Sequence, residues 1–397
     1  MQHRPAPYRQ PSAQPLALYV HWPFCLAKCP YCDFNSHVRA RVDTQAWERA
    51  LLADLDYEFG AVRDAGPIGS IFFGGGTPSL MPPALVAKLI ERADERRGLL
   101  PDCEITLEAN PSSVEAERFA ELASAGVNRV SLGLQALNDA DLRFLGRLHG
   151  ANEGIAALDV AQRHFGRVSF DLIYARPGQS GQAWREELER AIGFGTTHLS
   201  LYQLTIEPGT RFATDVRRGA FAPLDDDAAA DLFVMTREMT VAANLPAYEI
   251  SNFAQPGQES RHNLTYWRYG DYCGIGPGAH GRRRGAATQR HRKPENWMAA
   301  IDRQGHGIES ETPLAAEERA TEALLMGLRL AEGVDPAGIA QRTGLPEASL
   351  LDPAKVALHR GNGLLWQEGS RIGATEDGIR VLDALLAEIV ATARVAA

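Results

Sequence analysis

The sequence predicts an α/β protein built on a partial (β/α)6 barrel of the TIM type, and three observations support this. Six short β-rich runs alternate with longer amphipathic segments after residue 15. Such alternation is typical of parallel strands joined by right-handed helical crossovers. Polar, glycine-rich or thiol residues stand just past most of the strand runs, where active sites of these folds lie. With 397 residues, the chain is long enough for two or three domains.

The predicted elements follow in chain order. The helical patterns at 47–59, 84–97 and 115–126 separate the first strands, and Gly126 suits the end of the third helix. The predicted strands, rich in β-branched and aromatic residues, are 16–22, 68–74, 104–110, 129–135, 167–175 and 198–204.

After the barrel the rhythm of the sequence changes. Helical patterns dominate beyond residue 313, followed by two short runs that predict a hairpin and by a last helix from Glu376 to about Ala391. This order is typical of a small winged-helix-like domain. The predicted organisation is a flexible segment at 1–15, a barrel core at 16–245, a connecting region at 246–312 and a C-terminal helical domain at 313–397.

Composition and charge restrict the classes of function. The net charge of −9 argues against a general nucleic-acid binder, and the basic run 281–293 is interpreted as a solvated hairpin. The sequence contains no apolar run of membrane-spanning length and no secretory signal. We therefore expect a cytoplasmic protein, where isolated Cys103 and Cys273 pack as small core residues.

Three cysteines crowd into the loop after the first strand. Cys25, Cys29 and Cys32 form a C-x3-C-x2-C pattern. The pattern fits a [4Fe–4S] cluster with one iron left open; it also permits zinc, with His21 or His37 as fourth ligand, or thiol redox chemistry. A compact triplet without a second C-x2-C half favours the cluster.

An open iron needs a ligand from outside the protein. S-adenosylmethionine (SAM) can supply one through its amino and carboxylate groups, and its reductive cleavage is chemistry that belongs to the cofactor. The glycines of FFGGGTP let the backbone approach the methionyl ammonium. Glu108 can accept hydrogen bonds from a ribose, and Arg147 can pair with the methionyl carboxylate.

Several motifs together resemble a known family. YVHWPFCLAKCPYC, FFGGGTPSL, LEANP, SLGLQALND, LGRLH and DLIYARPGQ are similar to the radical SAM proteins of the oxygen-independent coproporphyrinogen III oxidase family. The resemblance covers nearly the whole chain from about residue 16 and implies a three-quarter (β/α)6 barrel. It assigns the cluster to Cys25, Cys29 and Cys32. It assigns SAM contacts to Tyr19, Tyr31 (beside the adenine), Gly75, Gly76, Thr77, Glu108, Gln135, Arg147 and Asp171.

Within that family, two functions from different classes compete. The oxidases carry a fourth cysteine where this chain has Phe34, and they have a longer N-terminal arm. HNLTYW (262–267) matches the HNxxYW motif of the heme-binding relatives. The resemblance therefore implies a heme chaperone rather than an enzyme that decarboxylates coproporphyrinogen III.

The chaperone prediction carries expectations about ligand and partners. His262 is the predicted heme ligand, with Cys273 as a rival thiolate. The expected partners are heme and a respiratory acceptor at the inner membrane, which the protein would approach peripherally; nucleic acid is not expected, and homodimerisation stays open.

Overall fold

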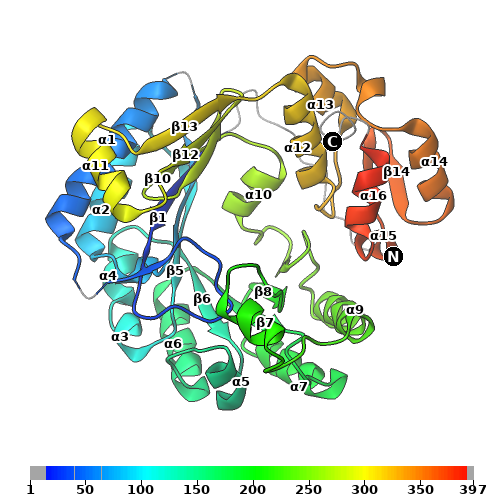
Figure 1. Cartoon of the computed structure of the whole chain (residues 1–397), viewed down its shortest axis with the longest axis horizontal. Coiled ribbons are helices and arrows are strands. Elements are labelled where there is room, and N and C mark those ends of the chain that lie inside the picture. The colour runs from blue at the N-terminus through cyan, green and yellow to red at the C-terminus, as the bar shows by residue number, and fades with distance from the viewer. Residues whose placement is uncertain (1–14, 40, 64, 391–397) are drawn as a thin grey trace.

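A mixed sheet of eleven strands runs through the molecule, and most helices cover its outer face (Figure 1). The computed structural model describes residues 15–39, 41–63 and 65–390, so the segment predicted at 1–15 lies outside the described residues except for Pro15. In spatial order the strands are β13 (Ile308–Pro313), β12 (Ala286–Arg290), β11 (His280–Arg283), β10 (Tyr272–Ile275), β1 (Leu16–Trp22), β4 (Ile68–Gly75), β5 (Leu99–Ala109), β6 (Arg129–Gln135), β7 (Arg167–Tyr174), β8 (His198–Gln203) and β9 (Asn252–Ala254).

Six neighbouring parallel strands, β1 and β4 to β8, form the partial barrel. They match the six predicted runs closely, which confirms the predicted α/β fold. Their outward side chains are almost entirely buried; Leu18, Phe73 and Leu107, for example, have no exposed surface. Their inner faces carry buried polar side chains such as Ser70 and Glu104, so apolar and polar residues alternate along these strands.

The helices begin and end largely where local signals place them. The first starts after Asp43, whose carboxylate accepts a hydrogen bond from the Ala46 amide, and the predicted third helix divides in two before Gly126. The barrel helices are α1 (Thr44–Ala61), α2 (Pro83–Arg97), α3 (Ser113–Ala116), α4 (Phe119–Ser124), α5 (Asp139–Phe144), α6 (Ala151–His164), α7 (Gly181–Ile192), α8 (Arg211–Arg217) and α9 (Asp226–Ala242).

The connecting region widens the sheet, which the sequence did not predict. Strand β10 joins β1 in parallel, and β11 to β13 continue as antiparallel strands. Helix α11 (Pro294–Gln304) covers this extension, and α10 (Arg261–Trp267) lies on the inner side of the barrel (Figure 1).

The basic hairpin at 281–293 is not solvated, so that expectation was wrong. Arg283 and Arg290 are buried and form ion pairs with Asp54 and Glu58, which are themselves fully buried on α1. The two carboxylates neutralise the guanidinium groups and allow the hairpin to pack against α1.

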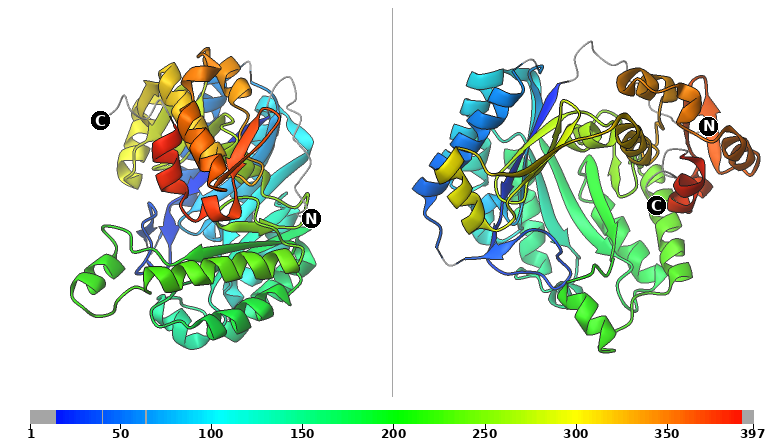
Figure 2. Two further views of the ribbon diagram at one scale, coloured as in Figure 1. Left: turned by 90° about the vertical axis from the view of Figure 1, so that its right-hand side faces the viewer. Right: turned by 45° about the horizontal axis from the view of Figure 1, so that its top comes forward.

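The C-terminal domain has an apolar core of its own, formed by residues such as Leu324, Leu350 and Leu386. It forms a lobe beside the barrel (Figure 2). Its elements are α12 (Ala316–Gly327), α13 (Pro336–Thr343), α14 (Pro353–Gly361), the predicted hairpin β14 (Leu365–Glu368) and β15 (Arg371–Ala374), and two short helices, α15 (Glu376–Ile379) and α16 (Leu382–Ile389).

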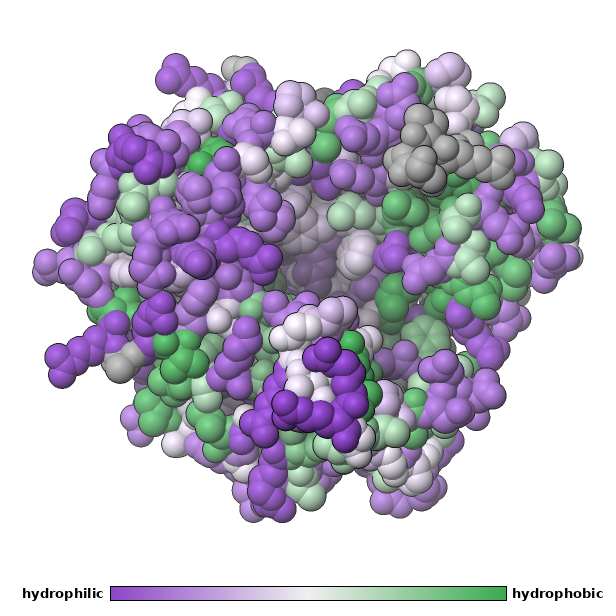
Figure 3. Space-filling view, in the orientation of Figure 1, coloured by the Kyte–Doolittle hydropathy of each residue, from purple (hydrophilic) through white to green (hydrophobic). Residues whose placement is uncertain are grey.

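The surface is hollowed near its centre (Figure 3), where Figure 1 places α10 beside the sheet. Among the described residues, no helix combines the length and apolarity that crossing a membrane requires.

Candidate cofactor site

The three clustered cysteines lie on a loop that a small ladder holds at both ends. Strand β2 (Phe24–Cys25) pairs in parallel with β3 (His37–Val38), so the loop between them is closed at its base. Cys25, Cys29 and Cys32 are free thiols, and each is partly exposed. Partial burial raises the pKa of Cys25 and of Cys32.

A chain of hydrogen bonds connects two of these thiols through three other side chains. The Thr77 hydroxyl donates to Cys25 Sγ (3.4 Å) and accepts from Asn110 Nδ2 (3.1 Å). Arg147 donates from Nη2 to Asn110 Oδ1 (2.5 Å) and from Nη1 to Cys29 Sγ (3.4 Å). This chain of hydrogen bonds brings Thr77 and Arg147, both predicted site residues, directly against the cysteine loop. Sequence reasoning did not assign Asn110 to the site, although it follows Glu108 in the LEANP motif.

The glycine segment after β4 passes close to the backbone before Cys25. A Cβ on Gly76 would lie 2.8 Å from the Phe24 carbonyl oxygen, and one on Gly75 would lie 2.6 Å from the His21 ring. Gly75 also has a φ of 115°, which disfavours any residue with a side chain. These two positions therefore require glycine for the loop and the strand to lie together.

Two carboxyl groups face the interior from β5 and β7, the strands on either side of β6. Glu108 accepts a hydrogen bond from the Gly75 amide, and Ser131 donates to Asp171 Oδ1 (3.2 Å). Burial, reinforced by the nearby Asp171, raises the pKa of Glu108 to about 8, and burial raises the pKa of Asp171 to about 6.

The remaining predicted SAM contacts border the same region. Tyr19 donates to or accepts from His21 Nδ1 (3.0 Å), and Tyr31 packs on Phe212 with its hydroxyl beside Cys29 and Arg147. Gln135 has a φ of 70°, an unusual backbone conformation of the kind that clusters at functional sites.

The raised pKa of Glu108 predicts a pH-dependent stability of the ligand-free protein. The folded state holds the carboxyl proton up to about pH 8, whereas the unfolded chain releases it near 4.5. The free energy of unfolding should therefore fall as pH rises through this window. Glu108→Gln should remove this contribution to the pH dependence. At pH 8 its free energy of unfolding should exceed that of the wild type by roughly 1–3 kcal/mol.

Denaturant unfolding at several pH values measures this effect. Glu117→Gln, at an exposed position on the surface, is the matched control and should leave the profile unchanged. Identical pH slopes for Glu108→Gln and wild type would contradict the assignment of a raised pKa.

The geometry fits a cluster better than a single zinc ion. In the described ranges, no three His, Cys, Asp or Glu side chains gather closely enough to hold one metal ion. His21, a candidate fourth ligand, has both ring nitrogens in hydrogen bonds, to Tyr19 Oη and to the Asn35 carbonyl (3.0 Å each). A [4Fe–4S] cluster binds each thiolate through a different iron, so its ligands stay apart.

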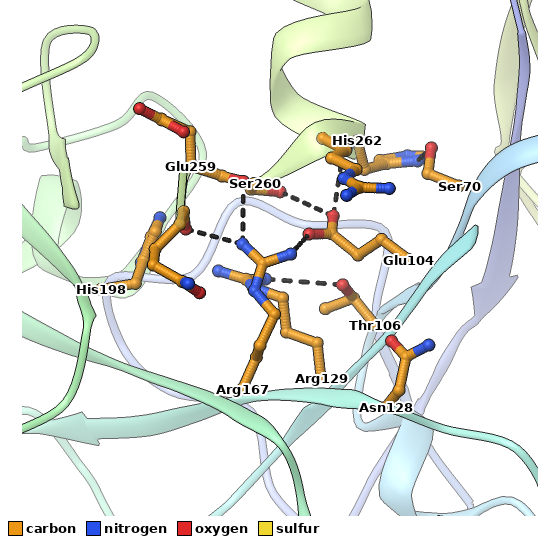
Figure 4. Close-up of polar contacts among 12 residues, drawn as sticks. Ser70, Glu104, Thr106, Asn128, Arg129, Arg167, His198, Glu259, Ser260 and His262 are labelled. Carbon is orange, nitrogen blue, oxygen red and sulfur yellow. Dashed lines mark hydrogen bonds and ion pairs between the residues drawn. The ribbon is translucent and has the colours of Figure 1, made fainter. Parts of the chain in front are cut away.

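The predicted heme ligand His262 lies behind the site rather than in it. It is 1% exposed, with Nδ1 against Ser70 Oγ (3.0 Å) and Nε2 against Tyr266 Oη (2.7 Å). Figure 4 shows His262 pointing toward Ser70, beside a polar network in which Glu104 pairs with Arg167. Binding iron through this imidazole would require one of its hydrogen bonds to break.

The rival thiolate is as deeply buried as His262. Cys273 on β10 is fully buried in the apolar core with Ile275, which agrees with its interpretation as a small core residue. Cys103 is buried as well.

Comparison with known proteins matches two parts of the chain to family models. Residues 19–191 match the model of the Radical SAM superfamily, and residues 314–381 match that of the HemN C-terminal domain. Membership in that superfamily implies a [4Fe–4S] cluster and SAM. Among solved structures, coproporphyrinogen III oxidase (HemN) from Escherichia coli has the same fold, with a TM-score of 0.79 over 94% of this chain and 90% of that one, at 22% identity.

Curated relatives are more similar in sequence. The heme chaperone HemW of Escherichia coli (strain K12) is 39% identical, with 94% of this chain and 97% of that protein covered. The mitochondrial radical S-adenosyl methionine domain-containing protein 1 of Bos taurus is also 39% identical, with 95% of this chain and 87% of that protein covered. The heme chaperone HemW of Mycobacterium tuberculosis (strain H37Rv) is 36% identical over 97% of this chain and 99% of its own. The chain therefore belongs to the HemW family of radical SAM proteins.

Proposed function

We propose that this protein is a heme chaperone, which binds heme and transfers it to an acceptor, while a [4Fe–4S] cluster and SAM support that role. The observation that carries the proposal is full-length similarity, at 39% identity, to a protein named as a heme chaperone. A second observation supports it. Phe34, which takes the place of the fourth cysteine of the oxidases, is 60% exposed beside the cysteine loop.

In this proposal the cysteine loop holds the cluster and the surrounding side chains hold SAM. When bound, the cluster supplies an electron to the sulfonium of SAM. The chain's own groups orient the ligand: Arg147 faces the methionyl carboxylate, Glu108 accepts from the ribose and Gly75 leaves room for the methionyl ammonium. The chain of hydrogen bonds through Asn110 supports these roles because it fixes Arg147 against Cys29. The other proposed SAM contacts are Tyr19, Tyr31, Gly76, Thr77, Gln135 and Asp171.

We extend the proposal to delivery at a membrane. The protein would take heme in the cytoplasm and pass it to a respiratory protein of the inner membrane through peripheral contact. Exposed apolar side chains on the cysteine loop and on the strand that closes it, Leu26 (62%) and Val38 (50%), support a contact surface there.

Heme titration followed by transfer tests the proposal. The anaerobically reconstituted protein should bind about one heme per chain, and inner-membrane vesicles lacking heme should then remove it. A protein that binds no heme, or that never releases it to the vesicles, would refute the chaperone role.

A further inference from the structure

A recess borders the SAM residues, and most of its wall has no role in SAM binding. Its cavity volume is about 380 Å³. Tyr19, Gly75 and Glu108 line the SAM side. The rest of the wall comes from the end of the cysteine loop, from α10 and from the sheet extension: Phe34, Asn35, Tyr266, Tyr272, Gly278, His280 and Arg292, together with His21.

The wall is suited to a flat aromatic ligand. Tyr266 and Tyr272 meet edge to face, with ring centroids 4.4 Å apart and planes at 88°. Phe34, at the end of the cysteine loop, is largely exposed. Arg292 is exposed at the rim, where a guanidinium can pair with a carboxylate of the ligand.

Two of the nearby imidazoles are already fully engaged. His21 lines the recess, but it is 5% exposed and both of its ring nitrogens are in hydrogen bonds. His262 lies one side chain deeper, behind Tyr266, and is engaged at both nitrogens as well. Neither can offer a lone pair to iron without breaking a contact.

His280 differs from both. It is the first residue of β11 and is exposed, and within 15–39, 41–63 and 65–390 no hydrogen bond to its imidazole is found. Its backbone is held tightly, because a Cβ on Gly274 of the neighbouring strand would lie 1.9 Å from the His280 carbonyl oxygen. The residue therefore combines a fixed backbone with a free side chain at the recess.

We propose that His280 is the axial ligand of the heme iron and that Arg292 pairs with a propionate of the same heme. This assignment rests on the proposed heme-binding function and replaces His262 as the coordinating residue. An imidazole nitrogen donates its lone pair to the iron, a bond forms between nitrogen and iron, and a weakly held water leaves the iron. No electron is transferred, and the iron keeps its oxidation state. His262 acts as a positioning residue, which holds Tyr266 in the wall.

Hemin titration of the full-length, reconstituted protein tests the assignment, with affinity and the ligand signature in electron paramagnetic resonance as readouts. His280→Ala should weaken heme binding by about tenfold or more and lose the imidazole signature, and added imidazole should restore that signature. Arg292→Gln should weaken binding and keep the signature. His262→Gln should also keep the imidazole signature. His164, exposed on the outer helix α6, provides the matched control, and His164→Ala should leave affinity and signature unchanged.

The outcomes separate the two proposals. A wild-type protein that binds no heme refutes the proposed function. A wild-type protein that binds heme, with a His280→Ala variant of unchanged affinity and signature, refutes the ligand assignment alone. Loss of the imidazole signature in a His262→Gln variant whose circular dichroism shows that it is folded would also refute the ligand assignment. So would a phenolate signature that is present in the wild type and persists in His280→Ala.

Discussion

Cys25→Ala is expected to abolish cluster binding. Cys25 ends β2 and faces Thr77, so no other thiol can replace it without rebuilding the loop. Since Cys29 and Cys32 alone would leave two irons of the cubane without protein ligands, the cluster should not persist. Iron per reconstituted chain should fall from about four to near zero, as measured by iron and sulfide analysis with the visible absorption spectrum.

Cys103→Ala is the matched control for that experiment. Cys103 is a free thiol 7% exposed in the core of the same barrel, so the variant should keep its cluster. A full iron–sulfur spectrum in Cys25→Ala would contradict the cluster assignment. Equal loss in both variants would mean that the effect reflects folding rather than ligation.

The second large effect is expected at the buried ion pairs that attach the sheet extension to α1. Asp54 accepts hydrogen bonds from Arg290 Nε (2.9 Å), Trp297 Nε1 (3.2 Å) and two backbone amides. Asp54→Ala would leave the fully buried Arg290 with only one of its two carboxylate partners, Glu58. We expect a loss of about 3–5 kcal/mol in the free energy of unfolding, as for other broken buried pairs.

A neighbour on the same helix provides the control. Asp56 pairs with Arg92 and Arg96 at the surface, where such pairs contribute about 1 kcal/mol or less. Chemical denaturation should therefore separate Asp56→Ala from Asp54→Ala clearly. Similar losses in the two variants would show that the buried network is not what holds the extension. Because β11 carries His280, Asp54→Ala should also weaken heme binding if our ligand assignment is correct.

The barrel was predictable because its signal is local. Each parallel strand has an apolar outward face, and helices with a 3.6-residue pattern separate the strands, so the alternation of strands and helices can be read directly. The cysteine loop and the glycine segment were predictable for a similar reason: their residue types suit few other structures.

The sheet extension was not predictable, because its partners are distant in sequence. β10 joins β1 some 250 residues away along the chain, and no local pattern marks that pairing. Likewise, the burial of the arginines in the basic hairpin could not be predicted. Their partners Asp54 and Glu58 lie on a helix, and acidic residues on helices usually face water, so nothing in the sequence indicated that these two are buried.

The HNxxYW motif was recognised, but its geometry was not. The spacing of four residues puts His262 and Tyr266 on one face of α10, where they bond to each other. That contact turns the histidine inward and the tyrosine toward the recess. His280, at the end of YCGIGPGAH, became a candidate only once the fold placed it in the same recess as Tyr266.

The central claim is that this chain carries heme rather than making its precursor. Incubating the anaerobically reconstituted protein with coproporphyrinogen III, SAM and a reductant, then measuring the porphyrin products, tests it most directly. We predict that coproporphyrinogen III remains intact in a preparation that binds about one heme per chain. Conversion to protoporphyrinogen IX through loss of two carboxyl groups would contradict the claim and identify the protein as an oxidase.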